Sequence, residues 1–164
     1  MSFRKEKKYR LTKSDFNILK NKLLNLGMNE LYKARNINSL YYDTDLLNLY
    51  NDSEEGVVPR KKVRVRWYDM INNANIETKI SSIEGRYKIK NPISLDNPDC
   101  FPKIINDQVY GSLTPSLLVS YLREYYTFNG MRLTFDSQIT YQSYRSSIET
   151  KYEDAERVME IKVN

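Results

Sequence analysis

The sequence predicts a mainly β (α+β) fold, an antiparallel sheet or barrel with one or two packing helices. Three observations favour this class. Most of the chain falls into runs of β-branched and aromatic residues that alternate with polar ones. Only one segment has a strong helical period. The 14 tyrosines lie largely in the alternating runs. A length of 164 residues without a linker or low-complexity segment fits one domain over residues 1–164.

The alternating segments are expected to be strands because side chains two residues apart share a face of a sheet. They are Phe3–Leu11, Asn38–Asp43, Arg60–Tyr68, Ile76–Ser81, Arg86–Lys90, Leu117–Phe128, Met131–Tyr141 and Arg157–Val163.

A helix is expected over Lys13–Leu26, with Thr12 or Ser14 as its cap, Gly27 as its stop, and one apolar face made by Phe16, Leu19, Leu23 and Leu26. A second, weaker helix is expected around Asp99–Val109. Tight turns are expected at Asn72–Asn75, as a hairpin connection, and at Phe128–Gly130.

The composition excludes several classes of protein. The chain has no histidine and one cysteine, Cys100, which excludes an internal disulfide framework, histidine-based triads and zinc–histidine sites. A metal would therefore sit on carboxylates, which favours Mg²⁺ or Mn²⁺. No apolar run reaches the length of a membrane span and the N-terminus has no hydrophobic core. We expect a cytoplasmic protein, and the net charge of +5 suggests an anionic partner.

The polar side chains of the predicted strands are mostly long cations. Lys62, Arg64 and Arg66 should share one face of their strand, with Val63, Val65 and Trp67 on the other. Glu-x-Lys occurs in three strands, as Glu6 with Lys8, Glu77 with Lys79, and Glu160 with Lys162. Tyr121 shares a face with Arg123, and Arg132 with Thr134 and Asp136.

Two interpretations of this face are open. In the simpler one, the strands are amphipathic and their polar face is solvated, with weak cross-strand ion pairs. In the other, the face lines a barrel, and its cations bind a chain of phosphates. The glutamates would then be ligands for a divalent ion that bridges phosphate oxygens. We favour the second interpretation, because nearly every strand contributes long cations with few carboxylates between them.

These segments resemble, in order, successive strands of the VTC domain, the polyphosphate polymerase branch of the triphosphate tunnel metalloenzymes, which are related to CYTH phosphatases and cyclases. The matching segments run from residue 4 to residue 162. They are Arg4-x-Glu6-x-Lys8-Tyr9, Ser39-Leu40-Tyr41-Tyr42-Asp43-Thr44, Lys62-Val63-Arg64-Val65-Arg66-Trp67-Tyr68, Glu77-Thr78-Lys79, Tyr121-x-Arg123, Arg132-Leu133-Thr134-Phe135-Asp136 and Glu160-Ile161-Lys162.

The resemblance implies an antiparallel barrel of eight strands around a basic tunnel, and metal-dependent transfer of the γ-phosphate of ATP to a polyphosphate chain. The catalytic residues it implies, which grip the triphosphate and the product, are Lys8, Arg64, Arg66, Lys79, Arg123 and Arg132. Lys62, Lys88 and Lys162 are expected to assist this binding. Glu160, with help from Glu6, is the expected ligand of Mn²⁺ or Mg²⁺, whereas Glu77 is expected to orient neighbouring cations.

The sequence also departs from the family pattern. In VTC domains, a helix and a last strand with a further basic residue usually follow the Glu-x-Lys strand, whereas this sequence stops at Asn164. We therefore expect a barrel that lacks its last helix and strand, a shorter variant that closes its barrel differently, or an impaired tunnel. We also expect an open sheet edge at Arg157–Val163. The region Asn91–Ser116 is also shorter than the family pattern.

Other functions stay open at this stage. One is a module that binds polyphosphate or inositol polyphosphate without turnover, and another is a tunnel triphosphatase that hydrolyses tripolyphosphate or a nucleoside triphosphate. The expected ligands are ATP, triphosphate and polyphosphate, and the resemblance also suggests a membrane-protein partner. Nucleic-acid binding is disfavoured, because the Glu-x-Lys pairs place carboxylates on the binding face.

Overall fold

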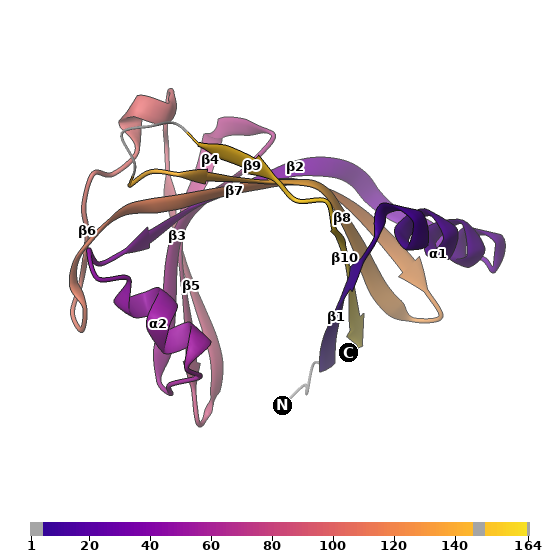
Figure 1. The fold of residues 1–164 in the computed structure, drawn as a ribbon, viewed down its shortest axis with the longest axis horizontal. Helices are drawn as coiled ribbons and strands as arrows, with labels where there is room; N and C mark the ends of the chain where they lie inside the picture. Colours follow the sequence, from indigo (N-terminus) through magenta and orange to yellow (C-terminus); the bar gives the residue numbers. More distant parts are fainter. Residues whose placement is uncertain (1–4, 146–149, 164) are drawn as a thin grey trace. The chain divides into compact units, whose positions relative to one another are not determined.

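A computed structural model describes residues 5–145 and 150–163, and most of them lie in antiparallel strands. Figure 1 shows the helices and strands. The helical elements are α1 (Lys13–Asn25), α2 (Asn48–Glu54) and the short 3₁₀ turn η1 (Pro98–Cys100). The strands are β1 (Lys5–Leu11), β2 (Asn29–Asp43), β3 (Arg60–Tyr68), β4 (Met70–Ser82), β5 (Gly85–Ile93), β6 (Ile105–Asp107), β7 (Gly111–Phe128), β8 (Met131–Ser143), β9 (Lys151–Glu153) and β10 (Arg157–Val163).

Hydrogen bonding joins eight strands in the order β1-β10-β8-β7-β2-β3-β4-β5, while β6 pairs with β7 and β9 pairs with β8. This confirms the mainly antiparallel β class. In the described part of the chain, the order begins at β1 and ends at β5 without a pairing between them, so the sheet is not closed there. The expectation that the barrel would be incomplete therefore agrees with the pairing.

Backbone contacts divide the chain into two compact units. Unit 1 consists of the described residues of Met1–Ile37, Ser120–Tyr141 and Tyr152–Asn164, and unit 2 of those of Asn38–Val119 and Gln142–Lys151. The strands β2, β7 and β8 each contribute residues to both units. The prediction of a single domain over residues 1–164 stays a prediction.

The core of unit 1 lies between α1 and the strands. The Thr12 hydroxyl accepts a hydrogen bond from the backbone N–H of Asp15 at 3.1 Å and so caps α1. Gly27 follows the helix with a φ of +98°, which glycine adopts without strain. One face of α1 packs on the sheet through Phe16, which is 5% exposed. Phe16 belongs to a hydrophobic cluster that also includes Phe135 and Met159.

The core of unit 2 lies on the apolar face of β3. Val63, Val65 and Trp67 are buried there and pack with residues such as Leu40 and Phe101. The alternation predicted for this strand is confirmed. The short helix α2 is fixed by Asp43, whose buried carboxylate accepts hydrogen bonds from the backbone N–H groups of Leu49 and Tyr50. This interaction keeps α2 beside β3, which it contacts.

The expected strands are all present, with bounds that agree closely for β3 and β10. The first expected strand included Phe3 and Arg4, which lie outside the described residues. The turn expected after Phe128 is confirmed: Asn129 and Gly130 both have positive φ, which matches the twist of the strands on either side. The helix expected over Lys13–Leu26 is confirmed, although Leu26 is 62% exposed and does not belong to its packed face.

Two expected elements are wrong. Residues 99–109 do not form a helix: the chain makes one 3₁₀ turn and then the strand β6, because Pro102 interrupts a helix and residues 105–107 pair with β7 instead. Asn72–Asn75 is not a turn. These residues lie inside β4, where Ala74 is buried and pairs with Ile93, and the chain reverses at Asp69 with a φ of +49°.

The expected sheet edge is also wrong. The strand Arg157–Val163 lies between β1 and β8, with which it forms antiparallel pairs, so it is interior. The ends of the strand order are β1 and β5.

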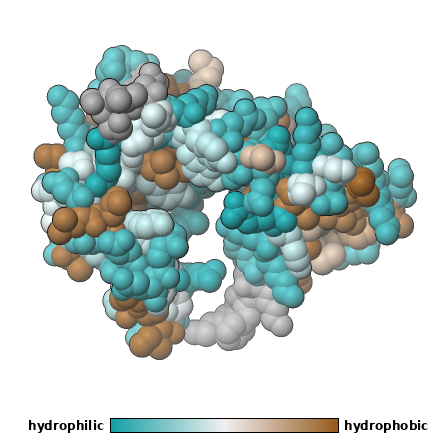
Figure 2. Space-filling model, in the orientation of Figure 1, coloured by the Kyte–Doolittle hydropathy of each residue, from teal (hydrophilic) through white to brown (hydrophobic). Residues whose placement is uncertain are grey.

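The face shown in Figure 2 is mainly hydrophilic, with hydrophobic residues in separate small patches. No described helix is long and apolar enough to cross a membrane.

Phe135→Ala should lower the free energy of unfolding by about 3–5 kcal/mol, because it opens a cavity in the core of unit 1. The Phe135 ring is 0% exposed and makes edge contacts with Phe16 and Tyr126, with centroids at 5.2 and 5.6 Å. Urea denaturation measures the change. Ile18→Ala, at a side chain that is 63% exposed, is the control and should change stability far less. Equal losses in the two variants would contradict this packing.

Candidate functional site

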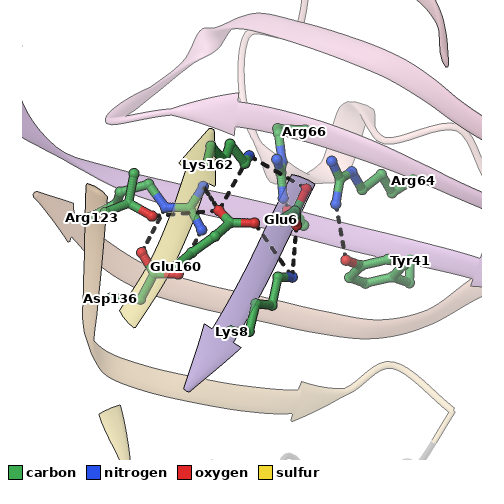
Figure 3. A network of polar contacts seen from close by, with 11 residues as sticks. Glu6, Lys8, Tyr41, Arg64, Arg66, Arg123, Asp136, Glu160 and Lys162 are labelled. Carbon is green, nitrogen blue, oxygen red and sulfur yellow. Dashed lines mark hydrogen bonds and ion pairs between the residues drawn. The ribbon is translucent and has the colours of Figure 1, made fainter. Parts of the chain in front are cut away.

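Strand register brings the two ends of the chain together on one polar face of unit 1. β1 and β10 are antiparallel, with Glu6 opposite Lys162 and Lys8 opposite Glu160. On its other side, β10 pairs with β8, which places Arg132 opposite Lys162 and Thr134 opposite Glu160. Directly opposite residues share a face. We call this set, together with Arg123 and Asp136, the unit 1 polar face (Figure 3).

Glu160 lies at the centre of the unit 1 polar face and is only 3% exposed. Its carboxylate oxygens lie 3.3 Å from Lys162 Nζ, 3.9 Å from Lys8 Nζ and 3.9 Å from Arg123 Nη1. Burial acts to raise the pKa of Glu160. The hydrogen bond with Glu6 and the charges of Lys162 and Lys8 outweigh burial and lower the pKa to about 2. Glu160 is therefore an anion at neutral pH.

Glu6 is the second carboxylate on the unit 1 polar face. It lies 3.8 Å from Lys8 Nζ and 3.9 Å from Lys162 Nζ. Its hydrogen bond with Glu160 raises its pKa, and burial and the negative charge of Glu160 act in the same direction. Two carboxylates this close repel each other when both are ionised, so a proton or a cation between them is favourable.

Arg123 is held by a second carboxylate, that of Asp136. Its Nε and Nη2 atoms each donate to an Asp136 oxygen at 2.6 Å, in the bidentate geometry that suits a guanidinium and a carboxylate. Asp136 is 6% exposed. The edge of the Arg123 guanidinium that carries Nε and Nη2 is therefore occupied within the protein.

Unit 2 has its own polar face, on β3, β4 and β5. Glu77 on β4 is 1% exposed and accepts from Arg64 Nε at 3.0 Å and Arg64 Nη2 at 2.6 Å. It also pairs with Lys88 at 2.5 Å and Lys90 at 3.8 Å. Burial acts to raise the pKa of Glu77, but the hydrogen bonds from Lys88 and Arg64 lower it to about 2. The Tyr41 hydroxyl accepts from Arg64 Nη1 at 3.0 Å (Figure 3). The expectation that Glu77 orients neighbouring cations agrees with these contacts.

A row of lysines crosses the unit 2 polar face beside Glu77. Lys79 on β4 is opposite Lys62 on β3 and Lys88 on β5. Burial lowers the pKa of Lys79, and the charges of Arg64, Arg66 and Lys88 lower it further, to about 8. Like charges directly opposite one another on a sheet are unfavourable. A bound anion would relieve this repulsion.

The predicted site residues therefore fall into two sets. Unit 1 brings together Glu6, Lys8, Arg123, Arg132, Glu160 and Lys162, and unit 2 brings together Lys62, Arg64, Arg66, Lys79 and Lys88. In the described part of the chain, no ion pair joins Lys62, Lys79 or Arg132 to a carboxylate. Their roles in binding or catalysis remain predictions.

Sequence reasoning missed several partners of these residues. Tyr41, Ser39 and Asp136 received no role, although they orient Arg64, Arg66 and Arg123; Arg66 Nε donates to the Ser39 hydroxyl at 2.9 Å. For Asp136, a signal was present, because its alternation with Arg132 and Thr134 already placed it on the polar face. For Tyr41 and Ser39, none was present, because their contacts depend on the pairing of β2 and β3.

Glu6 and Glu160 form a donor set that fits Mg²⁺ or Mn²⁺. Such hard cations are commonly held by one or two carboxylates, with phosphate oxygens and water completing the octahedron. Both carboxylates lie within 4 Å of the same two ammonium groups, those of Lys8 and Lys162, so they face a common position. No group of three or more acidic or cysteine side chains suited to a metal occurs among the described residues, so protein groups alone would not complete the coordination.

The fold and the polar faces define a class: an antiparallel β protein whose strands present arginine and lysine with a few buried glutamates. A family model of the VTC domain matches residues 3–164. The chain belongs to the VTC domain family, as the resemblance of its strand motifs predicted.

Solved structures share the fold at low identity. A candidate adenylate cyclase from Bacillus halodurans is 15% identical with a TM-score of 0.60, over 99% of this chain and 83% of that one. A conserved hypothetical protein from Pyrococcus furiosus is 14% identical with a TM-score of 0.57, over 98% and 78%. A Hippeastrum candidate adenylyl cyclase with a dominant triphosphatase activity is 16% identical with a TM-score of 0.51, over 97% and 79%. A search of curated proteins finds no match.

Glu77→Gln should lower the free energy of unfolding at pH 7 by about 3 kcal/mol or more, because it removes a buried anion from between Arg64 and Lys88. The pKa of Glu77 is lowered from 4.5 to about 2, so its ionisation stabilises the folded state above pH 4.5. This stabilisation is lost as the pH falls from 4.5 towards 2. The variant should therefore lose less stability than the wild type over that interval.

Urea denaturation between pH 2 and pH 7 measures both effects. Glu84→Gln, at an exposed position in the turn between β4 and β5, is the matched control and should follow the wild type at every pH. An acid profile of Glu77→Gln that is as steep as that of the wild type would contradict the role assigned to Glu77.

Proposed function

We propose that this protein is a metal-dependent phosphotransferase of the polyphosphate polymerase type, which transfers the γ-phosphate of ATP to a polyphosphate chain. The observation that supports this most is the pair of carboxylates, Glu6 and Glu160, beside Lys8 and Lys162 on the unit 1 polar face. Two neighbouring carboxylates among these cations would supply ligands for a divalent ion, which binding of a polyanion by cations alone does not require. Membership of the VTC family favours the same reaction.

Glu160 and Glu6 would hold the divalent ion, Mn²⁺ or Mg²⁺. When bound, the ion neutralises the oxygens of the phosphoryl group that is transferred. Because Glu160 has a pKa of about 2, it is ready to bind a cation over the whole physiological range. Lys8 and Lys162 lie on either side of the carboxylates and would contact the phosphate oxygens.

Each polar face also has cations that would contact phosphate groups. Lys62 and Lys79 in unit 2, and Arg132 in unit 1, are not held by carboxylates in the described part of the chain, so each can donate to a phosphate group without breaking an ion pair. Arg64 and Arg123 are held in fixed orientations by Glu77 and Asp136, so any N–H they turn to a phosphate is already aligned.

Transfer to polyphosphate does not require a protein side chain that acts as a general base. The terminal oxygen of a phosphate chain is already an anion, so alignment and charge neutralisation are enough, and the lack of histidine is no obstacle. If water were the acceptor, the same arrangement would make a triphosphatase. The dominant triphosphatase activity of the Hippeastrum protein makes hydrolysis the alternative to test. Binding of polyphosphate without turnover is the other alternative. A cytoplasmic location and a membrane-protein partner remain predictions.

Incubation with γ-labelled ATP, a short polyphosphate primer and Mn²⁺ should place label in long chains. Glu160→Gln should reduce this by at least a hundredfold, because the ligand of the ion loses its charge. Gel separation of the products measures the activity, and thermal unfolding confirms that each variant is folded. Glu30→Gln, at an exposed position of β2, is the matched control and should keep full activity.

The other outcomes separate the alternatives. Label released as free phosphate in a Glu160-dependent manner would replace the polymerase with a triphosphatase. Intact ATP together with tight binding of polyphosphate would contradict an enzyme and favour the binding module. Equal activity of Glu160→Gln and the wild type would contradict the metal site.

A further inference from the structure

Lys79 on β4 lies among cations on the unit 2 polar face. Its register partners are Lys62 on β3 and Lys88 on β5, so a lysine stands directly opposite it on both sides. Residues directly opposite one another on a sheet have Cβ atoms about 5 Å apart. Lys88 contacts the Glu77 carboxylate at 2.5 Å. In the described part of the chain, no ion pair joins Lys79 or Lys62 to a carboxylate. Lys79 therefore has positive neighbours on both sides within the sheet.

This position favours a neutral amine at Lys79. Desolvation by the surrounding protein lowers the pKa of Lys79, and the positive charges around it, those of Arg64 and Arg66 first, lower it further, to about 8. The side chain nevertheless reaches solvent, because Lys79 is one of the exposed residues of β4. A neutral amine is a nucleophile, whereas an ammonium group is not, and a lysine beside other cations is activated in this way. Lys79 therefore combines a reactive amine with access from solvent.

The neighbouring lysines determine which electrophile suits this amine. Lys62 and Lys88 flank Lys79 on both sides, and lysines bind phosphate groups through charge-assisted hydrogen bonds. An acyl phosphate joins a phosphate group to a carbonyl carbon, which is the atom that an amine attacks. Its leaving group is phosphate, and the same lysines would stabilise the negative charge that develops on it. Binding of the reagent and departure of its leaving group can therefore use the same two residues.

We propose that Lys79 is a site of acylation by small acyl phosphates, whose phosphate group binds to Lys62 and Lys88. The amine nitrogen forms a bond with the carbonyl carbon, and the bond between that carbon and the bridging phosphate oxygen breaks. Inorganic phosphate leaves with the electron pair, the nitrogen loses a proton to water, and an uncharged amide remains. The modification removes one positive charge from the unit 2 polar face. The inference goes beyond the proposed function, because this reaction requires neither ATP nor a divalent ion.

Incubation of the full chain with acetyl phosphate in EDTA, followed by mass spectrometry of its peptides, tests the proposal. At pH 8, acetylation of Lys79 should be about tenfold faster or more than that of Lys103, an exposed lysine between η1 and β6. The rate at Lys79 should rise between pH 6 and pH 8 and level off above pH 9, because the neutral fraction of the amine follows its pKa of about 8. Inorganic phosphate should slow the reaction by competition.

A second acetyl donor without charge, the N-hydroxysuccinimide ester, separates recognition of phosphate from reactivity of the amine. Lys62→Gln should slow acetylation of Lys79 by acetyl phosphate about threefold or more, and should slow the reaction with the ester less. Lys103→Gln removes the same charge outside the sheet and should change neither rate by more than about twofold.

Two results would overturn the proposal. If acetyl phosphate modifies Lys79 no faster than Lys103, Lys79 is not a site of acylation. If Lys62→Gln slows the reactions with the two donors equally, the neighbouring lysines do not recognise the phosphate group. Both results concern a reaction without ATP or metal, so they are distinguishable from a failure of the proposed phosphate transfer, which the labelled ATP measures.

Discussion

Three buried carboxylates determine how the long cations of this protein are arranged. Glu77, Asp136 and Glu160 are 1%, 6% and 3% exposed, and each faces at least two nitrogen atoms of arginine or lysine. A buried carboxylate is costly unless such partners surround it, and a buried guanidinium has the same requirement. Each buried carboxylate and the cations around it therefore depend on one another for their positions. The geometry of the polar faces depends on these three residues more than on the number of positive charges.

Much of this arrangement follows from the alternation of the strands. The pattern of Lys62, Val63, Arg64 and Val65 correctly separated a polar face from an apolar core, because a strand places successive side chains on opposite sides. The capped helix α1 was predictable for a similar reason, since its cap and its apolar period are both local signals.

Local signals failed where the pairing of strands decided the structure. Asn72–Asn75 has the composition of a turn, but the chain stays extended there within β4, whose residues Ala74 and Asn75 pair with β5. The helix α2 was missed because the carboxylate that accepts from the backbone of its first turn, that of Asp43, lies five residues before its first residue.

The candidate site was predictable as a set of residues but not as a network. Residue types identified the cations and the glutamates, and the ordered motifs identified the VTC family. Which cation is held by which carboxylate depends on strand register and could not be inferred from spacing. Glu6 and Glu160 illustrate this, since they are 154 positions apart in the sequence and meet only because β1 pairs with β10.

The strand β5, at one end of the strand order, has a consequence for solubility. An exposed strand edge can recruit the same strand from another molecule, which is a common start of aggregation. Here Pro92 cannot donate a hydrogen bond to an added strand, and Arg86, Lys88 and Lys90 would face their own copies across the new pairing. The basic residues of β5 therefore protect the molecule from self-association as well as bordering the unit 2 polar face. Concentrated salt, which screens such repulsion, would weaken that protection and leave the missing N–H of Pro92 as the remaining barrier.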